Sequence, residues 1–516
     1  KNIRVLVIEP PVQRPIFDKA RPNGGLGPAY LVGALRKHGI EVDYLDASVG
    51  QRGRNLKETF YRRVEMENGN IVYGMNTNEF PNIFYKYDII ATSSIFSAQT
   101  RMHFEIAAIA KKVAKENGKE ILMISGGVNA RALREHFLSN GFDIIALADG
   151  ETTIIQIVNQ FSSDKPDYSK VERIAFRKNN KTIMTSAPFR KSTKFIDHVP
   201  QAALDVFPLE VYQNLSNPSQ SPHRRGTRFA GIQTSRGCQD KCTFCHISLE
   251  KDEKEMLGNI GFIRMFSKER IAEDVSLSTR LGVTRLYFED DNLFFNKKRL
   301  FQLAPSLKRE NLSYSNVNGA NIRFMVKKVN NGYEVDDEFI NMLADFGLDE
   351  LMLPFETRSK EIMKKYATGK YDPEEMDPVG ILKSLKKAGI RIRSNFLIGF
   401  RDESWESVLR TKEFVKELFE EGLDQVKFGI PVPYPGTLDF ENEMSKPDVR
   451  KDFNENLLKY TDLMHPLGRP LFNTKVPPDK LVSAVNDFWQ EINTKAYVKE
   501  NMSTNLTKTN LISEAF

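Results

Sequence analysis

Arg236-Gly237-Cys238-Gln239-Asp240-Lys241-Cys242-Thr243-Phe244-Cys245-His246 is the stretch that holds all three cysteines of the 516-residue chain. The spacing of Cys238, Cys242 and Cys245 is C-x3-C-x2-C. Disulfide frameworks spread paired cysteines along a chain, so three thiols in one short loop predict a metal or redox site. Iron–sulfur clusters normally take four thiolates, and three thiolates leave one iron open for chemistry.

Three alternatives compete with a cluster. The run from Cys242 to His246 is C-x-x-C-H, which fits covalent haem attachment but leaves Cys238 without a role. A zinc site formed by the three cysteines and His246 is the second, although adjacent Cys245 and His246 are poorly placed to bind one ion. The third alternative is a chance spacing.

The cysteine loop directly follows the first of six expected strands. These strands are 231–234, 285–289, 317–322, 350–355, 390–398 and 425–430. Helical patterns separate them, for example at 269–281, 337–346 and 378–388. Because a complete eight-stranded barrel needs about 250 residues, six strand–helix units favour a partial (β/α)6 barrel.

The N-terminal part of the chain shows a second alternation of strands and helices. Strands are expected at 4–9, 41–46, 88–93, 120–125 and 143–147, and helices at 29–38 and 104–115. This order predicts a Rossmann-like (flavodoxin-like) parallel sheet, in which ligands sit beyond the carboxyl ends of the strands. A glycine-rich stretch, Gly24 to Gly27, opens the first helix without satisfying G-x-G-x-x-G.

We therefore expect an α/β protein of four successive regions. They are an N-terminal ligand-binding domain at 1–160, a proline-rich linker at 161–226, a barrel core at 227–445 and a helical C-terminal region at 446–516.

With these motifs the sequence resembles the cobalamin-dependent radical S-adenosylmethionine (SAM) enzymes, of the class B methyltransferase type. The resemblance implies that Cys238, Cys242 and Cys245 hold a [4Fe–4S] cluster, whose open iron binds SAM. It implies a SAM-binding set on the strand ends and in the cysteine loop: Phe244, Glu289, Asp290, Asp291, Glu356, Thr357, Arg358 and Asn395. Arg358 stands where the family's E-S-G-S element has glycine, and Lys364–Lys370 is also similar to the family.

The same resemblance implies cobalamin in the N-terminal domain. The residues that match its corrin-binding loops are Gly24, Gly25, Leu26, Gly27, Ser93, Ser94, Ser125, Gly126, Gly127, Gly150 and Glu151. No D-x-H-x-x-G motif surrounds any of the seven histidines, which predicts base-off cobalamin without a histidine lower ligand. The alternative is a flavodoxin-like domain with glycine-rich turns and no cofactor.

The function implied is methylation of an unactivated carbon. A 5′-deoxyadenosyl radical derived from SAM takes the hydrogen, and methylcobalamin supplies the methyl group. Tyr434, in the Pro-Tyr-Pro-Gly-Thr loop after the sixth strand, is the candidate catalytic residue. A non-methylating rearrangement or cyclisation, a tRNA methylthiotransferase, and a cobalamin or haem carrier without catalysis are the alternatives.

The amino-acid composition indicates which kinds of partner to expect. The chain has 40% hydrophobic and 28% charged residues and a net charge of +6, with no basic stripe, so we expect no nucleic-acid partner. It has no run of about 18 apolar residues, so we expect no membrane span. We expect a cytoplasmic enzyme, a small-molecule or peptide or protein substrate, and a low-potential electron donor such as flavodoxin or ferredoxin.

Overall fold

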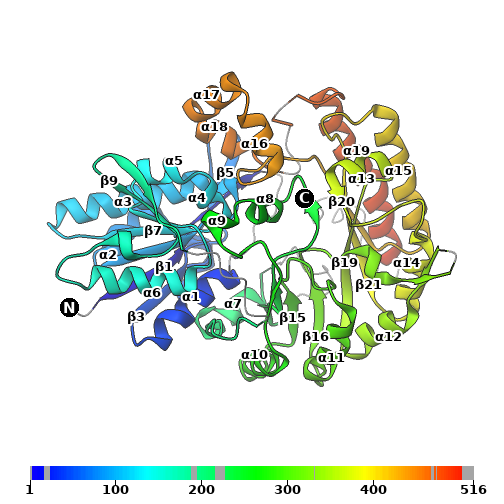
Figure 1. Cartoon of the computed structure of the whole chain (residues 1–516), viewed down its shortest axis with the longest axis horizontal. Coiled ribbons are helices and arrows are strands. Elements are labelled where there is room, and N and C mark those ends of the chain that lie inside the picture. Colours follow the sequence, from blue (N-terminus) through cyan, green and yellow to red (C-terminus); the bar gives the residue numbers. More distant parts are fainter. Residues whose placement is uncertain are drawn as a thin grey trace. The chain divides into compact units, whose positions relative to one another are not determined.

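The chain folds into two compact units. The computed structural model describes residues 3–16, 22, 24–187, 195–215, 227–330, 332–465, 470–471 and 473–501. Unit 1 comprises Lys1–Arg228, Leu249–Arg264 and Tyr434–Asp462, and unit 2 comprises Phe229–Ser248, Met265–Pro433 and Leu463–Phe516. Figure 1 shows both units with their element labels. In the part of the chain that the structure describes, no helix is both long and apolar enough to cross a bilayer.

Unit 1 is built on a seven-stranded sheet in the order β10-β9-β8-β7-β6-β1-β3. Five strands are parallel: β1 (Arg4–Glu9), β3 (Glu41–Asp46), β6 (Ile89–Ser93), β7 (Leu122–Gly126) and β8 (Ile144–Ala146). Numbered along the chain, their spatial order is 2-1-3-4-5, which reverses between β1 and β6. In such a doubly wound sheet the ligand crevice lies at this reversal, beyond the carboxyl ends of the strands.

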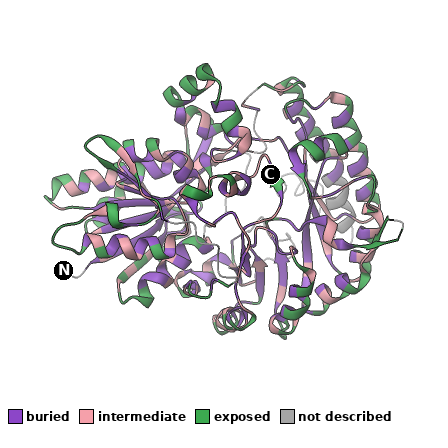
Figure 2. Cartoon of the chain, viewed as in Figure 1, coloured by how far each residue is buried: buried purple, intermediate pink, exposed green. Residues whose placement is uncertain are grey.

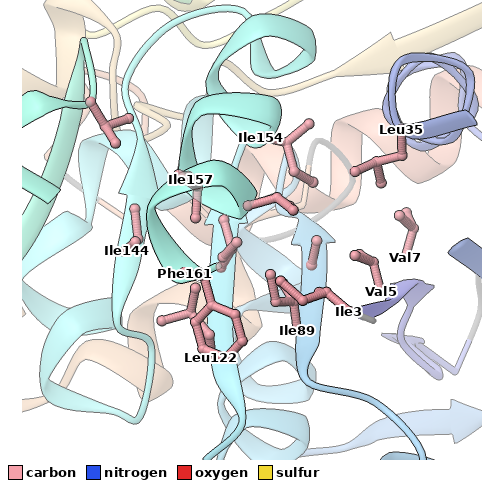
Figure 3. Packing of buried hydrophobic residues seen from close by; sticks show 14 of the residues in the cluster. Ile3, Val5, Val7, Leu35, Ile89, Leu122, Ile144, Ile154, Ile157 and Phe161 are labelled. Atoms are coloured by element: carbon pink, nitrogen blue, oxygen red, sulfur yellow. The ribbon is translucent and has the colours of Figure 1, made fainter. Parts of the chain in front are cut away.

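Alternate residues of these strands form one hydrophobic core. Val5, Ile89 and Leu122 point to the face covered by α1 (Leu26–Lys37) and α6 (Gly150–Phe161), as Figure 3 shows. Burying each such side chain contributes about 1.5–3 kcal/mol. The opposite face carries α3 (Thr100–Glu116), α4 (Val128–Ala132) and α5 (Arg134–Ser139), and Phe104 of α3 packs edge to face on Phe137 of α5 at 5.1 Å between ring centroids (Figure 1).

Two later stretches of sequence complete unit 1. The first is part of 161–226, where β9 (Ile174–Lys178) and β10 (Lys181–Met184) add an antiparallel edge to the sheet. The second is the segment of α16 (Leu438–Met444), α17 (Pro447–Glu455) and α18 (Leu457–Leu463). Asp462 is 3% exposed, and it accepts hydrogen bonds from Gln13 at 2.8 Å and from Arg101 at 2.6 Å. The sheet of unit 1 thus extends into the region that we expected to be a linker.

Unit 2 is a six-stranded parallel sheet whose strands follow chain order. The strands are β11 (Phe229–Ile232), β15 (Arg285–Phe288), β16 (Ser313–Asn316), β19 (Leu348–Glu356), β21 (Arg391–Leu397) and β22 (Gln425–Gly429). The connecting helices include α10 (Lys268–Arg280), α11 (Lys297–Leu307), α12 (Asp337–Asp345), α14 (Pro378–Lys387) and α15 (Trp405–Glu420). Buried residues follow the strands in both units (Figure 2).

The third strand of unit 2 corrects one expectation. We expected a strand at 317–322, but the strand is Ser313–Asn316, and Ile322–Met325 is a 3-10 helix. The sequence of the strand, Ser-Tyr-Ser-Asn, is polar because only one of its faces packs on the helical layer. On that face Tyr314 stacks on Phe288, with 5.3 Å between the ring centroids. The long C-terminal helix α19 (Pro478–Asn501) packs on β22, with Phe488 against Phe428; residues 502–516 of the expected helical region lie outside the described residues.

Candidate functional site

The cysteine loop of unit 2 begins just beyond β11. Gly237 has φ +84, a conformation that glycine adopts without strain and that turns the chain before Cys238. Cys242 lies on β13 (Lys241–Cys242), which pairs with β20 (Ala367–Thr368), and the Thr243 amide donates to the Tyr366 carbonyl at 2.9 Å. The loop is therefore fixed by the segment that follows β19.

Burial affects the ionisation of two of the three thiols. Burial raises the pKa of Cys242 and of Cys245 to about 12, so both thiols need bound metal to ionise. Among the described residues, no group of three or more His, Cys, Asp or Glu side chains could hold one metal ion.

A buried ion pair stands beside the cysteines. Lys370 donates to the Glu356 carboxylate at 2.5 Å, and its ammonium lies 5.4 Å from the centroid of the Phe244 ring. Burial lowers the pKa of Lys370, but Glu356 and the cysteine thiolates raise it more, so the side chain stays charged. Glu356 has φ +60, an uncommon conformation for a residue with a Cβ. Sequence reasoning gave Lys370 no role, although the resemblance of Lys364–Lys370 to the family pointed to this segment.

The three acids after β15 have different tasks. Asp290 accepts from the Thr234 amide at 2.9 Å, the Thr234 hydroxyl at 2.6 Å and the Ser235 hydroxyl at 2.6 Å. Asp291 accepts from the Gly237 amide at 2.6 Å, which places it under the cysteine loop. Only the side-chain carboxylate of Glu289 accepts no hydrogen bond among the described residues, and burial followed by Asp290 raises its pKa to about 7. Of these three acids, all predicted to bind SAM, Glu289 is therefore the one whose carboxylate can accept hydrogen bonds from a ligand.

Several side-chain polar atoms of unit 2 are buried without a partner among the described residues. They include the Ser315 hydroxyl oxygen on β16 and the Asn395 amide oxygen on β21. An unsatisfied buried polar atom costs about 1–3 kcal/mol, so such atoms mark places where a ligand completes the hydrogen bonding. Asn395 was predicted from the resemblance to the family. Ser315 was not predicted, because a lone serine gives no sequence signal.

The predicted residues Thr357 and Arg358 point elsewhere. Thr357 is fully buried and its hydroxyl shares a 3.0 Å hydrogen bond with Thr411 of α15. The guanidinium of Arg358 lies 5.5 Å from the centroid of the Phe414 ring and lines a surface depression of about 830 Å³ with Glu361 and Arg410. The structure thus groups Glu356 and Lys370, but not Arg358, with the cysteine loop.

Phe244 belongs to an apolar cluster at the same end of unit 2. It packs beside Phe400, with ring centroids 6.1 Å apart, and beside Ile362 and Tyr366. Gly399 has φ +83, and a Cβ there would lie 2.4 Å from a methyl carbon of Leu481. Gly399, just beyond β21, thus accommodates helix α19.

In unit 1, the loops after β6 and β7 form a tightly packed edge. Gly127 has φ +87, and a Cβ there would meet the Ser94 carbonyl oxygen at 2.5 Å. Asn129 donates to the Ser94 hydroxyl at 2.9 Å. Beyond them Ile95 is 50% exposed and Phe96 69% exposed. Adjacent exposed apolar side chains at the switch point of a doubly wound sheet are typical of a site for a large apolar ligand.

The remaining predicted residues of unit 1 have structural contacts as well. A Cβ at Gly150 would lie 2.8 Å from Leu31, so this glycine permits close packing of α6 on α1. Ser125 accepts from Thr92 at 3.0 Å, and Thr92 also contacts buried His103 at 3.1 Å. Burial lowers the pKa of His103 to about 3, so it stays neutral.

Three other predicted residues lie at or near the starts of α1 and α6. Leu26 is buried at the start of α1, and Glu151 is 7% exposed. A Cβ at Gly27 would lie 3.6 Å from the Ser93 hydroxyl.

Tyr434, the predicted catalytic residue, lies in the part of the chain that joins unit 1 after β22. Its carbonyl accepts from the Thr437 amide at 3.1 Å and from the Thr437 hydroxyl at 2.7 Å, which closes the loop. Gly436 has φ +88 and faces Val128, 3.0 Å from where a Cβ would be. The Pro-Tyr-Pro-Gly-Thr loop therefore packs directly beside the Gly127 turn.

The fold and the site of unit 2 can be compared with known proteins. Unit 2 combines parallel strand–helix units with a three-cysteine loop after its first strand. The sequence profile of the Radical SAM superfamily matches residues 232–415, from the end of β11 into α15. Over these residues the chain is similar to the radical SAM superfamily of enzymes.

More of the chain resembles particular members. "Uncharacterized methyltransferase PH0819" of Pyrococcus horikoshii is 24% identical over 443 residues, which cover 85% of this chain and 82% of that protein. The radical SAM methyltransferase TsrM from Kitasatospora setae, solved with cobalamin and a [4Fe–4S] cluster, matches with a TM-score of 0.59 and 13% identity over 86% of this chain and 75% of TsrM.

A second solved structure covers almost the whole chain. The cobalamin-dependent SAM radical enzyme OxsB, solved with aqua-cobalamin, matches with a TM-score of 0.61 and 18% identity. The match covers 95% of this chain but 62% of OxsB, so the chain spans less than two thirds of that protein. At these identities the two structures show a shared fold.

Proposed function

We propose that the protein is a cobalamin-dependent radical SAM methyltransferase that methylates an unactivated carbon. The observation that carries the proposal is the presence, in one chain, of two strand-end sites. Unit 2 has a three-cysteine loop with a buried cation beside it, and unit 1 has a glycine-lined edge with exposed apolar residues. The radical SAM domain implies a [4Fe–4S] cluster and SAM, and the cobalamin-containing structural matches support cobalamin.

In unit 2, which we assign as a partial (β/α)6 barrel, Cys238, Cys242 and Cys245 would hold the cluster. Glu289 offers an acceptor for the SAM amino group, because Asp290 and Asp291 are engaged within the protein. Lys370 places a positive charge where a carboxylate of SAM can use it. Ser315 and Asn395 supply unsatisfied oxygens for ligand donors. Together with SAM, the cluster supplies a 5′-deoxyadenosyl radical that removes hydrogen from carbon.

In unit 1, which we assign as a flavodoxin-like cobalamin-binding domain, the glycine turns and exposed Ile95 and Phe96 suit a large planar ligand. Bound methylcobalamin would supply the methyl group, and we propose that it is base-off without a histidine lower ligand. Buried His103 is engaged with Thr92 and held neutral, so it is committed to the fold. The Ser93–Ser94 and Gly126–Gly127 turns would line the lower face of the ring.

The remaining assignments follow from the same proposal. We propose a small-molecule or peptide or protein substrate, a flavodoxin or ferredoxin as electron donor, no nucleic-acid partner and a cytoplasmic location. Tyr434 remains the candidate catalytic residue, since its loop adjoins the Gly127 turn of the proposed cobalamin site.

The test is anaerobic reconstitution of the full chain with iron, sulfide and hydroxocobalamin, followed by SAM and a reductant. Mass spectrometry then measures 5′-deoxyadenosine and S-adenosylhomocysteine. Both products, with a base-off cobalamin absorbance spectrum, support the methyltransferase. Cobalamin binding with 5′-deoxyadenosine alone, in the presence of an accepted substrate, points to rearrangement or cyclisation. A chain that binds cobalamin without cleaving SAM would be a carrier.

A further inference from the structure

Two carboxylates end the neighbouring strands β1 and β3. Glu9 and Asp46 are directly paired in the register of the two strands. Each receives a tyrosine hydroxyl: Tyr44 donates to Glu9, and Tyr212 donates to Asp46 at 2.6 Å. Tyr212 comes from α7 (Leu209–Tyr212), far along the chain in the segment that we expected to be a linker. Four polar side chains from three elements therefore meet at the carboxyl edge of the sheet.

The Glu9 carboxylate also holds the glycine loop that opens α1. It accepts the amide of Gly24 at 3.0 Å and the amide of Gly25 at 3.4 Å. Gly25 is the N-cap of α1 and has no side chain to cap the helix. Glu9 thus supplies, from another element, acceptor oxygens for backbone amides at the start of the helix.

The loop can take this conformation only with glycine at position 24. Gly24 has φ +86, and a Cβ there would lie 2.8 Å from a ring carbon of Tyr212. Tyr212 is in turn fixed by Asp46 at 2.6 Å. The loop is therefore enclosed between Glu9 and the Tyr212 ring.

This arrangement lowers the stability of the fold. Burial and, after it, neighbouring Asp46 raise the pKa of Glu9 to about 8, although the donors from Tyr44, Gly24 and Gly25 lower it. A buried carboxylate beside a second one lowers stability, and such groups concentrate at functional sites. Glu9 also ends β1, one of the two strands between which the strand order reverses, where ligands bind.

We propose that Glu9 is a positioning residue, which fixes the Gly24–Gly25 loop and thereby sets how tightly unit 1 binds cobalamin. That the ligand is cobalamin rests on the proposed function, whereas the fixing of the Gly24–Gly25 loop by Glu9 does not. Glu9 acts through the loop backbone, with Asp46 and Tyr212 keeping the opposite side of the loop in place.

The experiment compares the full-length wild type with Glu9→Gln, Glu9→Ala and the control Glu41→Gln. Glu41 lies at the other end of β3 with a side chain 46% exposed, paired with Arg4. Amide hydrogen exchange at Gly24 and Gly25 is measured without ligand, and hydroxocobalamin affinity is measured by absorbance titration. Circular dichroism identifies any variant that does not fold.

We expect Glu9→Ala to speed exchange at both amides and to weaken cobalamin binding, each by about tenfold or more. Glu9→Gln keeps the shape and one acceptor oxygen, so it should give a smaller effect of the same sign. Glu41→Gln should change neither quantity.

Unchanged exchange in folded Glu9→Ala and Glu9→Gln would overturn the hold on the loop. Faster exchange with unchanged affinity would overturn the link to cobalamin. A wild-type chain that binds no cobalamin would overturn the proposed function together with the affinity half of this proposal. The exchange data would then still decide whether Glu9 fixes the loop.

Discussion

The ammonium group of Lys370 lies 2.5 Å from the carboxylate of Glu356, and the pair stands beside the thiol of Cys242. The two residues come from adjacent segments, the end of β19 and the turn after β20. A charged pair in a buried position is sensitive to the loss of either partner, because the other charge is then left unpaired. The pair therefore offers a direct test of the site in unit 2.

Lys370→Met removes the positive charge and keeps most of the side-chain length. We expect SAM cleavage to fall by about 10- to 100-fold, since charge-assisted hydrogen bonds contribute about 1.5–3 kcal/mol. Lys364→Met is the matched control, because Lys364 is an exposed lysine of the same segment. Production of 5′-deoxyadenosine is measured in cluster-loaded protein, with cluster content determined by iron analysis. Equal rates for Lys370→Met and wild type would remove Lys370 from the site.

Glu289→Gln tests the free carboxylate beyond β15. The pKa of Glu289, about 7, lies above the ordinary value of 4.5, so its folded form binds a proton more tightly than its unfolded form does. Stability should therefore fall as pH rises from about 4.5 to about 7, and Glu289→Gln should lose this fall. The same variant should raise the KM for SAM by about tenfold at pH 8.

Thermal unfolding between pH 5 and pH 8 measures the stability effect, and initial rates measure the KM. Asp290→Asn is the contrasting variant, since Asp290 accepts three hydrogen bonds from Thr234 and Ser235. It should lower the melting temperature more than Glu289→Gln does at every pH. An unchanged KM in Glu289→Gln would contradict the assignment of this carboxylate to SAM.

Glu350→Gln tests an ion cluster in the middle of unit 2. Glu350 is fully buried, its carboxylate lies 2.8 Å from Arg393, and it lies 4.0 Å from Arg285. Removing its charge should lower the free energy of unfolding of unit 2 by about 3–5 kcal/mol. Both tryptophans, Trp405 and Trp489, belong to unit 2, so tryptophan fluorescence in urea reports this loss. A change below about 1 kcal/mol would show that the arginines are satisfied without Glu350.

Gly127→Ala tests the turn after β7. An added Cβ would lie 2.5 Å from the Ser94 carbonyl oxygen, so the turn has to move. We expect cobalamin affinity to fall by about tenfold or more. The control is Gly118→Ala, because Gly118 also has positive φ (+57) but meets nothing within 4 Å. The comparison separates the close contact from backbone strain, and equal affinities in the two variants would contradict a role for the turn.

Periodic strands could be predicted closely from sequence, because burial on one or both faces leaves a continuous apolar pattern. The bounds of β1 and β3 agree with expectation residue for residue. The strand Ser313–Asn316 could not be predicted, since its serines face the interior of unit 2 and give no apolar signal. The cysteine loop was predictable because its spacing is rare, whatever the surrounding fold.

Pairings between distant segments could not be predicted. Nothing in the sequence near Glu9 indicates that Tyr212 will meet Asp46, 166 residues away from it. Lys370 was missed for a similar reason, since a lysine in a polar turn is typically a solvated surface residue. Arg358 shows the converse: its place in a motif suggested a ligand, but the structure stacks it on Phe414.

Unit 1 draws on three separate stretches of chain, and the last of them ends at Asp462. Buried Asp462 accepts hydrogen bonds from Gln13 and Arg101, which precede it by 449 and 361 residues and are therefore synthesised well before it. At roughly 5–20 residues per second, synthesis of the intervening chain takes on the order of 20–70 s. Throughout that interval the sheet of unit 1 lacks the packing of α16, α17 and α18. During synthesis in the cell, the nascent chain would therefore need protection from premature association until the stretch that ends at Asp462 has been made.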